Sequence, residues 1–327
     1  MMDDLDKLPL VFEIAEEIYA GGNPQGAVPY YECVAENERH QHDENLAISQ
    51  YRLFRTALGK DLEKNRDAAI RFANFRNRLP LNYQLDAYYK LAGLSFNLHK
   101  WGEVESYADE LQTLVKIVYR DELGKLKSKK NSHPLVTDHP FVFYYGYSYL
   151  AKSTALQKNG QYEEAKQYIS GYADLSWIEI LDEQGMEVIE KFKLWPKGNG
   201  YTLDILQGHT ENLSDYTHFL EENPNEILSG LVTVESANKY GFLIDHILGQ
   251  FKDEIDQFDN CIETVDINRH LRFRYQLAKY QFHQGRRING FENTLHSTML
   301  SVSINSHQMK YLLELLFWNM SSAKKLR

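Results

Sequence analysis

The stretch YLAKSTALQKNGQYEEAKQYISGY, residues 149–172, limits the fold of this chain more than any other segment. Small or apolar residues recur every three or four positions on both sides of Gly160, namely Tyr149, Ser153 and Leu156 before it and Tyr162, Ala165, Ile169 and Tyr172 after it. This spacing places each set on one face of a helix. Gly160 can adopt the left-handed conformation that ends a helix, and the small side chains of Ser153 and Ala165 allow close antiparallel packing. The stretch therefore predicts a helix–turn–helix hairpin.

Less regular copies of this hairpin occur along the chain, and together they resemble the tetratricopeptide repeat, whose period is about 34 residues. The copies lie at 14–34, 67–80, 91–111, 198–224 and 275–295. In the first copy, Asn23 can cap the second helix, with Pro24 at its first helical position. Strand patterns are nearly absent, because the few short apolar runs also suit helices.

The resemblance implies an all-α fold, a right-handed superhelix of tetratricopeptide-like helical hairpins. In such an array each hairpin buries its apolar face only against its neighbours. We expect one repeat domain over residues 1–327, with breaks in the array near 122–138 and 183–200.

The segment HQMKYLLELLFWNM, residues 307–320, is expected to form a terminal helix. The residues expected to pack on the last repeat are Leu312, Leu315, Leu316 and Trp318. The apolar residues of this segment are too numerous for one buried stripe. A surplus apolar face is typical of an interface, so we expect a homodimer.

Composition, charge and cysteine usage exclude several classes of protein. Apolar residues make up 43% of the chain, enough for a buried core, and the net charge of −10 repels nucleic-acid phosphates. The lysine-rich stretch 120–133 is expected to be a solvated loop, or alternatively a contact surface. Cys33 and Cys261 lack partners at metal-binding spacing, and a disulfide framework is not expected. The N-terminus does not resemble a secretion signal, and no apolar run reaches the ~18 residues of a membrane helix. We therefore expect a soluble cytoplasmic protein.

No constellation of residues indicates a chemical reaction. The stretch RHQHDEN brings together His40, His42, Asp43 and Glu44. Histidines two positions apart diverge on a helix and do not converge on zinc, so these residues are expected to form a polar helix boundary. The remaining histidines are scattered, without a nucleophile motif near them. We therefore expect no enzyme activity, no metal and no cofactor.

Aromatic residues are dense in HPFVFYYGYSYL, residues 139–150. They are Phe141, Phe143, Tyr144, Tyr145, Tyr147 and Tyr149, and one helical face cannot bury them all. Some must therefore lie on the concave wall or at an interface. Two interpretations stay open: these residues pack the core and the neighbouring hairpins, or they form a ligand-facing wall to which tyrosine supplies area and a hydroxyl.

Three stretches, at 44–65, 68–92 and 163–195, resemble the sensor part of helix-turn-helix transcriptional regulators from Bacillus and its relatives. Those regulators look related to the RRNPP group of peptide-pheromone receptors. The resemblance implies a regulatory module that binds a short signalling peptide in its concave groove. Nothing before residue 10 could supply a DNA-binding domain, so we expect a truncated sensor, or one that acts without touching DNA. DNA contact would then come only through a missing N-terminal helix-turn-helix domain. The alternative is a protein–protein adaptor that holds a partner protein's tail or helix in the same groove.

We expect the groove to be lined by the first helices of the hairpins, at positions offset from the packing positions. The predicted residues are Tyr89, Gly93, Phe96 and Asn97 in the third hairpin, Tyr147, Leu150, Thr154, Gln157 and Lys158 in the fourth, Lys197, Tyr201 and Asp204 in the fifth, and Arg272, Tyr275, Lys279 and Phe282 in the last. The side-chain amides of Asn97 and Gln157 can each donate to and accept from a peptide unit. Lys158 or Lys279 would meet a C-terminal carboxylate. The alternative for Asn97 is a cap at the end of its helix.

Overall fold

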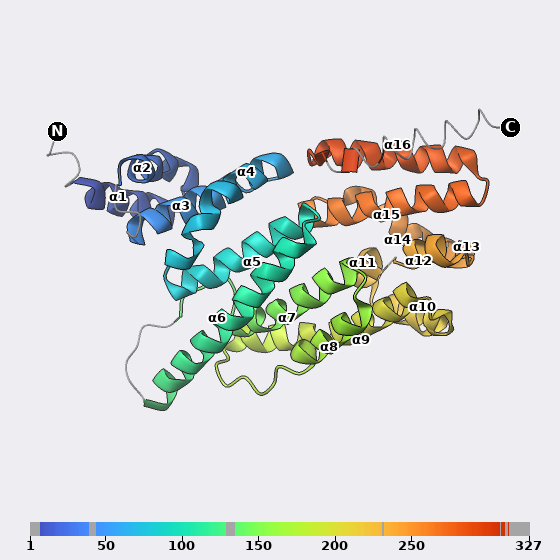
Figure 1. Cartoon of the computed structure of the whole chain (residues 1–327), viewed down its shortest axis with the longest axis horizontal. Helices are drawn as coiled ribbons and strands as arrows, with labels where there is room; N and C mark the ends of the chain where they lie inside the picture. Colours follow the sequence, from blue (N-terminus) through green and yellow to red (C-terminus); the bar gives the residue numbers. More distant parts are fainter. Residues whose placement is uncertain are drawn as a thin grey trace.

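The computed structural model describes residues 7–38, 44–128, 135–230, 232–307, 309, 310 and 313. Over these residues the chain is built from helices and has no strand, which confirms the all-α prediction (Figure 1). The elements are α1 (Leu8–Ala20), α2 (Pro24–Asn37), α3 (Glu44–Ala57), α4 (Leu62–Phe72), η2 (Ala73–Arg78), α5 (Leu81–Asn97), α6 (Trp101–Ser128), α7 (Phe141–Lys158), α8 (Tyr162–Ala173), α9 (Glu183–Gln207), η3 (Thr210–Asn212), α10 (Leu213–Glu222), η4 (Pro224–Glu226), α11 (Ile227–Gly230), α12 (Thr233–Tyr240), α13 (Asp245–Gln250), α14 (Lys252–Gln257), η5 (Phe258–Asn260), α15 (Thr264–His283) and α16 (Arg287–Ser303). None of the described helices combines a bilayer-spanning length with a sufficiently apolar sequence.

Four hairpins share one turn geometry, in which a residue in the left-handed conformation separates two helices. The turn residues are Gly22, His99, Gly160 and Gly285, with φ of 84°, 57°, 79° and 75°, and in each case the second helix begins two residues later. Gly160 donates its N–H to the oxygen of Gln157 at 3.1 Å, and Gln161 donates to that of Leu156 at 2.9 Å, a pair of bonds that closes a helix C-terminus. The predicted conformation of Gly160 is confirmed. His99 adopts it without being glycine, at a cost of roughly 1–2 kcal/mol.

Small residues at fixed distances from these turns let the paired helices approach closely. Seven residues before the turn residue lie Ala15, Ala92, Ser153 and Ala278, and five residues after it lie Ala27, Val104, Ala165 and Gly290, all of them buried. The Ser153 hydroxyl also donates to the backbone oxygen of Ala165 at 2.9 Å. A methyl group added at Gly290 would come within 2.6 Å of the Phe282 ring. The predicted close approach at Ser153 and Ala165 is therefore confirmed.

Some helices begin or end where the local sequence predicts, and others do not. Asn23 caps α2 as predicted, since its Oδ1 accepts the N–H of Gly26 at 3.0 Å. The lysine-rich stretch, which the sequence predicts to be a loop, is instead helical as far as Ser128. Lysine is a good helix former and is favoured near a helix C-terminus, and Lys125 forms an ion pair with Glu122 at 2.6 Å. Residues 129–134 lie outside the described part of the chain.

The helix is not interrupted over 183–200, where the sequence suggests a break in the array. α9 is continuous from Glu183 to Gln207, and the irregular segment precedes it at 174–182. Within α9, a methyl group added at Gly198 would lie 2.8 Å from the Phe219 ring. Glycine at this position therefore lets α10 pack closely on α9 and does not end the helix.

Two segments far apart in the sequence meet where the start of α4 lies against the end of α16, as Figure 1 shows. The N–H of Leu62 donates to the oxygen of Ile304 at 3.1 Å, and Asn305 Nδ2 donates to Asp61 Oδ1 at 3.0 Å. We call these contacts the α4–α16 clasp. Leu62 and Ile304 also share one core cluster with Leu271 of α15. The expectation that each hairpin packs only against its neighbours is therefore wrong.

The terminal helix expected at 307–320 falls mostly outside the described residues. His307, Met309, Lys310 and Leu313 are helical, and Met309 and Leu313 are buried in the core cluster that includes Ile304. Leu312, Leu315, Leu316 and Trp318 are not among the described residues. The homodimer inferred from them stays a prediction.

Candidate functional site

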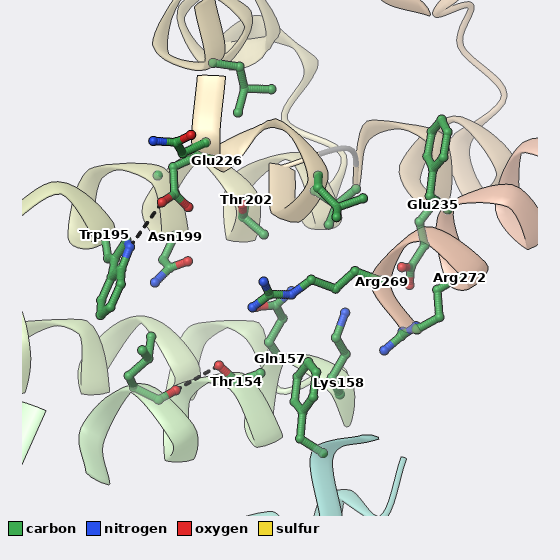
Figure 2. A pocket seen from close by; sticks show the side chains of 18 of the residues that line it. Thr154, Gln157, Lys158, Trp195, Asn199, Thr202, Glu226, Glu235, Arg269 and Arg272 are labelled. Atoms are coloured by element: carbon green, nitrogen blue, oxygen red, sulfur yellow. Dashed lines mark hydrogen bonds between the residues drawn. The ribbon is translucent and has the colours of Figure 1, made fainter. Parts of the chain in front are cut away.

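A cavity of about 460 Å³ lies between helices from the middle and the C-terminal part of the chain (Figure 2). Its walls come from α5, α7, α9, α10, η4, α11, α12 and α15. Pockets for small ligands measure about 300–1,000 Å³. The cavity depends on contacts between distant elements, because they bring α15 opposite α7.

One wall of the cavity is aromatic. It includes Tyr89 of α5 and Phe143 and Tyr147 of α7. The Tyr89 ring meets the other two edge to face, with centroids 5.1 Å from Phe143 and 4.8 Å from Tyr147. On another side of α7, Tyr145 packs against Trp177 at 5.1 Å. The dense aromatic run thus divides between the cavity and packing elsewhere.

The polar part of the wall includes two amides without a hydrogen-bond partner among the described residues, Gln157 of α7 and the more exposed Asn225 of η4. The side chain of Gln157 has no hydrogen-bond partner within the described part of the chain, and it borders the cavity. Its neighbours are already engaged: Thr154 Oγ1 donates to the backbone oxygen of Leu150 at 2.8 Å, and Trp195 Nε1 donates to Glu226 at 3.2 Å (Figure 2). Gln157 can therefore both donate to and accept from a ligand.

Three cationic side chains meet at one end of the cavity. Lys158 at the end of α7 points toward Arg269 and Arg272 of α15, and Glu235 of α12 lies beside Arg272 (Figure 2). Arg269 also forms an ion pair with Asp266 at 3.0 Å. The positive charge at this end contrasts with the net charge of −10 on the whole chain.

Burial and like charge both act on this cationic end. Burial is the largest cause that lowers the pKa of Lys158 to about 7; Arg272 and Arg269 contribute to this lowering, and Glu235 opposes it. Burial likewise lowers the pKa of Arg272. The pKa of nearby His99 falls to about 4, first through burial and then through Arg272. An anionic group in the cavity would relieve this repulsion.

The residues predicted to bind the peptide divide into two sets. Those that line the cavity are Tyr89, Phe96, Tyr147, Leu150, Thr154, Gln157, Lys158 and Arg272. Those that do not are Gly93, Asn97, Lys197, Tyr201, Asp204, Tyr275, Lys279 and Phe282. The binding role of the first set remains a prediction.

On α9 the predicted face is off by one residue, and on α15 the prediction agrees with the cavity at Arg272 but not at Tyr275, Lys279 and Phe282. The lining residues are Trp195, Gly198, Asn199 and Thr202 on α9, and Asn268, Arg269, Arg272, Phe273 and Gln276 on α15. Tyr201, one position before Thr202, packs instead near Tyr216 with ring centroids 6.0 Å apart. Tyr275, one position before Gln276, packs on the core cluster that includes Leu271. The register is correct on α7, where the repeat pattern is strongest.

Two other predicted residues are held by contacts outside the cavity. Asp204 forms an ion pair with Lys166 at 2.7 Å and accepts a hydrogen bond from Asn212 at 3.0 Å. The ammonium group of Lys279 lies 5.8 Å from the ring centroid of Tyr275. Neither Asp204 nor Lys279 borders the cavity.

Asn97 joins two helices that are far apart in the sequence. Asn268 Nδ2 donates to the backbone oxygen of Asn97 at 3.0 Å and lies 3.3 Å from its side-chain oxygen. The His99 ring is also 3.3 Å from Asn268 Oδ1. Asn97 does not line the cavity, and its contacts with Asn268 fit the alternative of a structural role at the end of its helix.

Several cavity residues are not predicted from the sequence. Asn199 and Thr202 would have followed from the correct register on α9. Glu226 and Glu235 come from η4 and α12, which do not follow the hairpin pattern. No periodic signal in the sequence could have identified those two carboxylates.

A cluster of possible metal ligands lies outside the cavity, and the spacing of its residues in the sequence does not indicate it. Asp259, His270 and His296 come from η5, α15 and α16, and their candidate ligand atoms lie within 4.8 Å of one another. Arg274 Nε donates to His270 Nε2 at 2.8 Å. A guanidinium therefore occupies the position that a metal would take on His270, and these residues could hold an ion only if Arg274 moved. In the stretch RHQHDEN, the residues before Glu44 lie outside the described part of the chain.

The cavity combines an aromatic wall, an uncommitted amide at Gln157 and a cationic end at Lys158, Arg269 and Arg272. This arrangement suits an extended ligand with apolar groups, amide units and an anionic terminus. Any functional conclusion depends on this geometry, because protein-family models and curated proteins give no match to the chain.

Proposed function

We propose that this chain is the peptide-sensing module of a transcriptional regulator and binds a short signalling peptide in the cavity. The supporting observation is that the cavity brings together the aromatic wall, the free amide of Gln157 and the cationic end. A short peptide carries a matching group for each: side chains, backbone amides and a C-terminal carboxylate. Any contact with DNA would be made by a helix-turn-helix domain outside these residues.

In this proposal Gln157 pairs with a peptide unit of the ligand, and Tyr147 covers a ligand side chain. The C-terminal carboxylate lies against Lys158 and Arg272. A peptide loses conformational entropy on binding, and leaving one of its amide groups desolvated and unpaired costs about 1–3 kcal/mol. An uncommitted amide in the wall is therefore central to affinity.

We also propose that the hairpins form a right-handed tetratricopeptide-like superhelix that curves until α4 meets the end of α16. The shared turn geometry and the buried small residues beside it support a repeated unit. A peptide that contacts α7 and α15 together would favour the closed arrangement over a more open one. Such a shift in population is how ligand binding would be communicated to a partner domain.

The proposal is tested by titrating pooled short random peptides with free C-termini into the protein and measuring affinity by calorimetry. Gln157→Ala should weaken the binding of the selected peptides by about ten- to a hundredfold. The matched control is Gln167→Ala, because Gln167 is exposed on α8 and should leave affinity unchanged. Equal affinity in both variants would contradict the assigned role of Gln157. If no short peptide binds but a partner protein's tail or helix does, the adaptor alternative replaces peptide sensing.

A further inference from the structure

Lys158, half-buried in the cavity wall, differs from the buried Lys152 because its amine faces the cavity without a partner among the described residues. No hydrogen bond or ion pair joins this amine to the described residues, although the side chain lies among protein groups. The charged groups that face it are Arg269 and Arg272 of α15 and Glu235 of α12 (Figure 2). The titratable His99 at the α5–α6 turn also interacts with it electrostatically.

Lys152, on the same helix, shows the usual arrangement of a buried lysine. Its Nζ lies 2.8 Å from Glu105 and 2.7 Å from Asp109. Burial opposes the charge, but these bonds hold the pKa of Lys152 above its ordinary value. At Lys158, burial and the neighbouring arginines instead lower the pKa to about 7. The contrast arises from the absence of a bonded carboxylate at Lys158.

We propose that Lys158 is a nucleophilic amine that forms an imine with an anionic carbonyl compound, an aldehyde or 2-oxo acid, whose anionic group lies against Arg269 and Arg272. A lysine that is desolvated or placed beside other cations is the form that attacks carbonyl groups. The two arginines supply the attraction for the anion, and the cavity has room for a small ligand. This site shares Lys158 and Arg272 with the proposed peptide site, but imine formation does not require a bound peptide.

The reaction balances without an oxidant or reductant. The lone pair of Nζ attacks the carbonyl carbon, and a C–N bond forms as the carbonyl π electrons move to oxygen, which takes up a proton. The carbinolamine then loses its hydroxyl group as water, and the C=N bond forms. The carbonyl oxygen and the two hydrogens of the neutral amine leave together as one water molecule.

The test uses the full chain at pH 7 with glyoxylate, an anionic aldehyde, and cyanoborohydride to trap the imine as a stable secondary amine. Peptide mass spectrometry then gives the rate at each lysine. An amine with a pKa near 7 is about half neutral at this pH, whereas an ordinary lysine is neutral in about one molecule in several thousand. Allowing for its lower basicity, Lys158 should react at least about tenfold faster than the exposed Lys116. Lys158→Met should remove this fast adduct.

The role of the arginines is tested by the ratio of the rates with glyoxylate and with acetaldehyde, which carries no charge. Arg272→Met should lower this ratio at Lys158, and Arg269→Met gives a second measurement if the first variant does not fold. Modification of Lys158 no faster than that of Lys116 would overturn the proposal. A ratio unchanged in both arginine variants would overturn the anion site. Peptide binding is measured on unreacted protein. A failure of the peptide-binding proposal can therefore be distinguished from a failure of the imine proposal.

Discussion

Replacing Lys158 by methionine should raise the free energy of unfolding at neutral pH. Burial and, after it, the neighbouring arginines lower the pKa of this lysine from its ordinary value of 10.5 to about 7. A lowering of about 3.5 corresponds to about 5 kcal/mol against the charged folded form. Part of the side chain borders the open space of the cavity, where water and relaxation reduce this cost, so we expect a gain of roughly 2–4 kcal/mol. Methionine has a similar length and carries no charge to desolvate.

The sign of the pH dependence follows from proton binding. Between pH 7 and 10.5 the unfolded chain holds a proton on this lysine that the folded protein has released. The free energy of unfolding of the wild type should therefore gain a contribution that rises with pH through this window, by up to about 1.4 kcal/mol per pH unit. The methionine variant lacks this contribution, and its advantage should shrink as the pH rises.

The assay is urea denaturation of the wild type and Lys158→Met, followed by circular dichroism at pH 7, 8 and 9. The control is Lys152→Met, which removes the ion pairs with Glu105 and Asp109 and should destabilise the protein. Equal stability of the wild type and Lys158→Met at pH 7, with parallel pH dependence, would show that the amine is hydrated in the folded protein. That result would refute the reasoning.

Two further predictions concern packing. Asn97→Ala should destabilise the protein by about 0.5–1.5 kcal/mol, which would be measured as a lower melting temperature. Ligand affinity per folded molecule should stay unchanged. Weaker binding without a loss of stability would indicate that Asn97 contacts the ligand. Gly146→Ala should cost about 1–3 kcal/mol, because the added methyl group would lie 2.5 Å from a ring carbon of Phe192. Its control, Gly200→Ala in the interior of α9, meets no atom within 4 Å and should be neutral or stabilise by up to about 1 kcal/mol. Similar stability of the two alanine variants in denaturant titrations would contradict the packing described at Gly146.

The sequence predicts hairpins well where the turn and the apolar faces agree. At Gly160 the left-handed residue, the helix that follows it and the face of α7 directed at the cavity are all recognisable. At His99 the same turn forms without glycine, so the residue that most strongly indicates the end of a helix is missing from the sequence. On α9 and α15 the pattern tolerates more than one register. A shift of one position turns a helix face by about 100°. A prediction with this shift therefore places Tyr201 at the cavity, where the structure has Thr202.

The closure of the array could not be predicted in the same way. The bonds from Leu62 to Ile304 and from Asn268 to Asn97 join residues with no shared motif. Periodicity reports which face of a helix is apolar and not which distant helix covers it. The cationic end of the cavity depends on this closure, because Lys158 and Arg272 lie on helices from different parts of the chain.

The α4–α16 clasp also has a consequence for how the protein folds. In an open repeat array, folding can start anywhere and spread between neighbours, and the end repeats fray first. Here the bond between Leu62 and Ile304 must close a loop of most of the chain, at an entropic cost of about 5 kcal/mol or more. Contacts of such long range slow folding. We therefore expect the hairpins to form early and the clasp late, with hydrogen exchange at the Leu62 amide reporting the opening of the closed array.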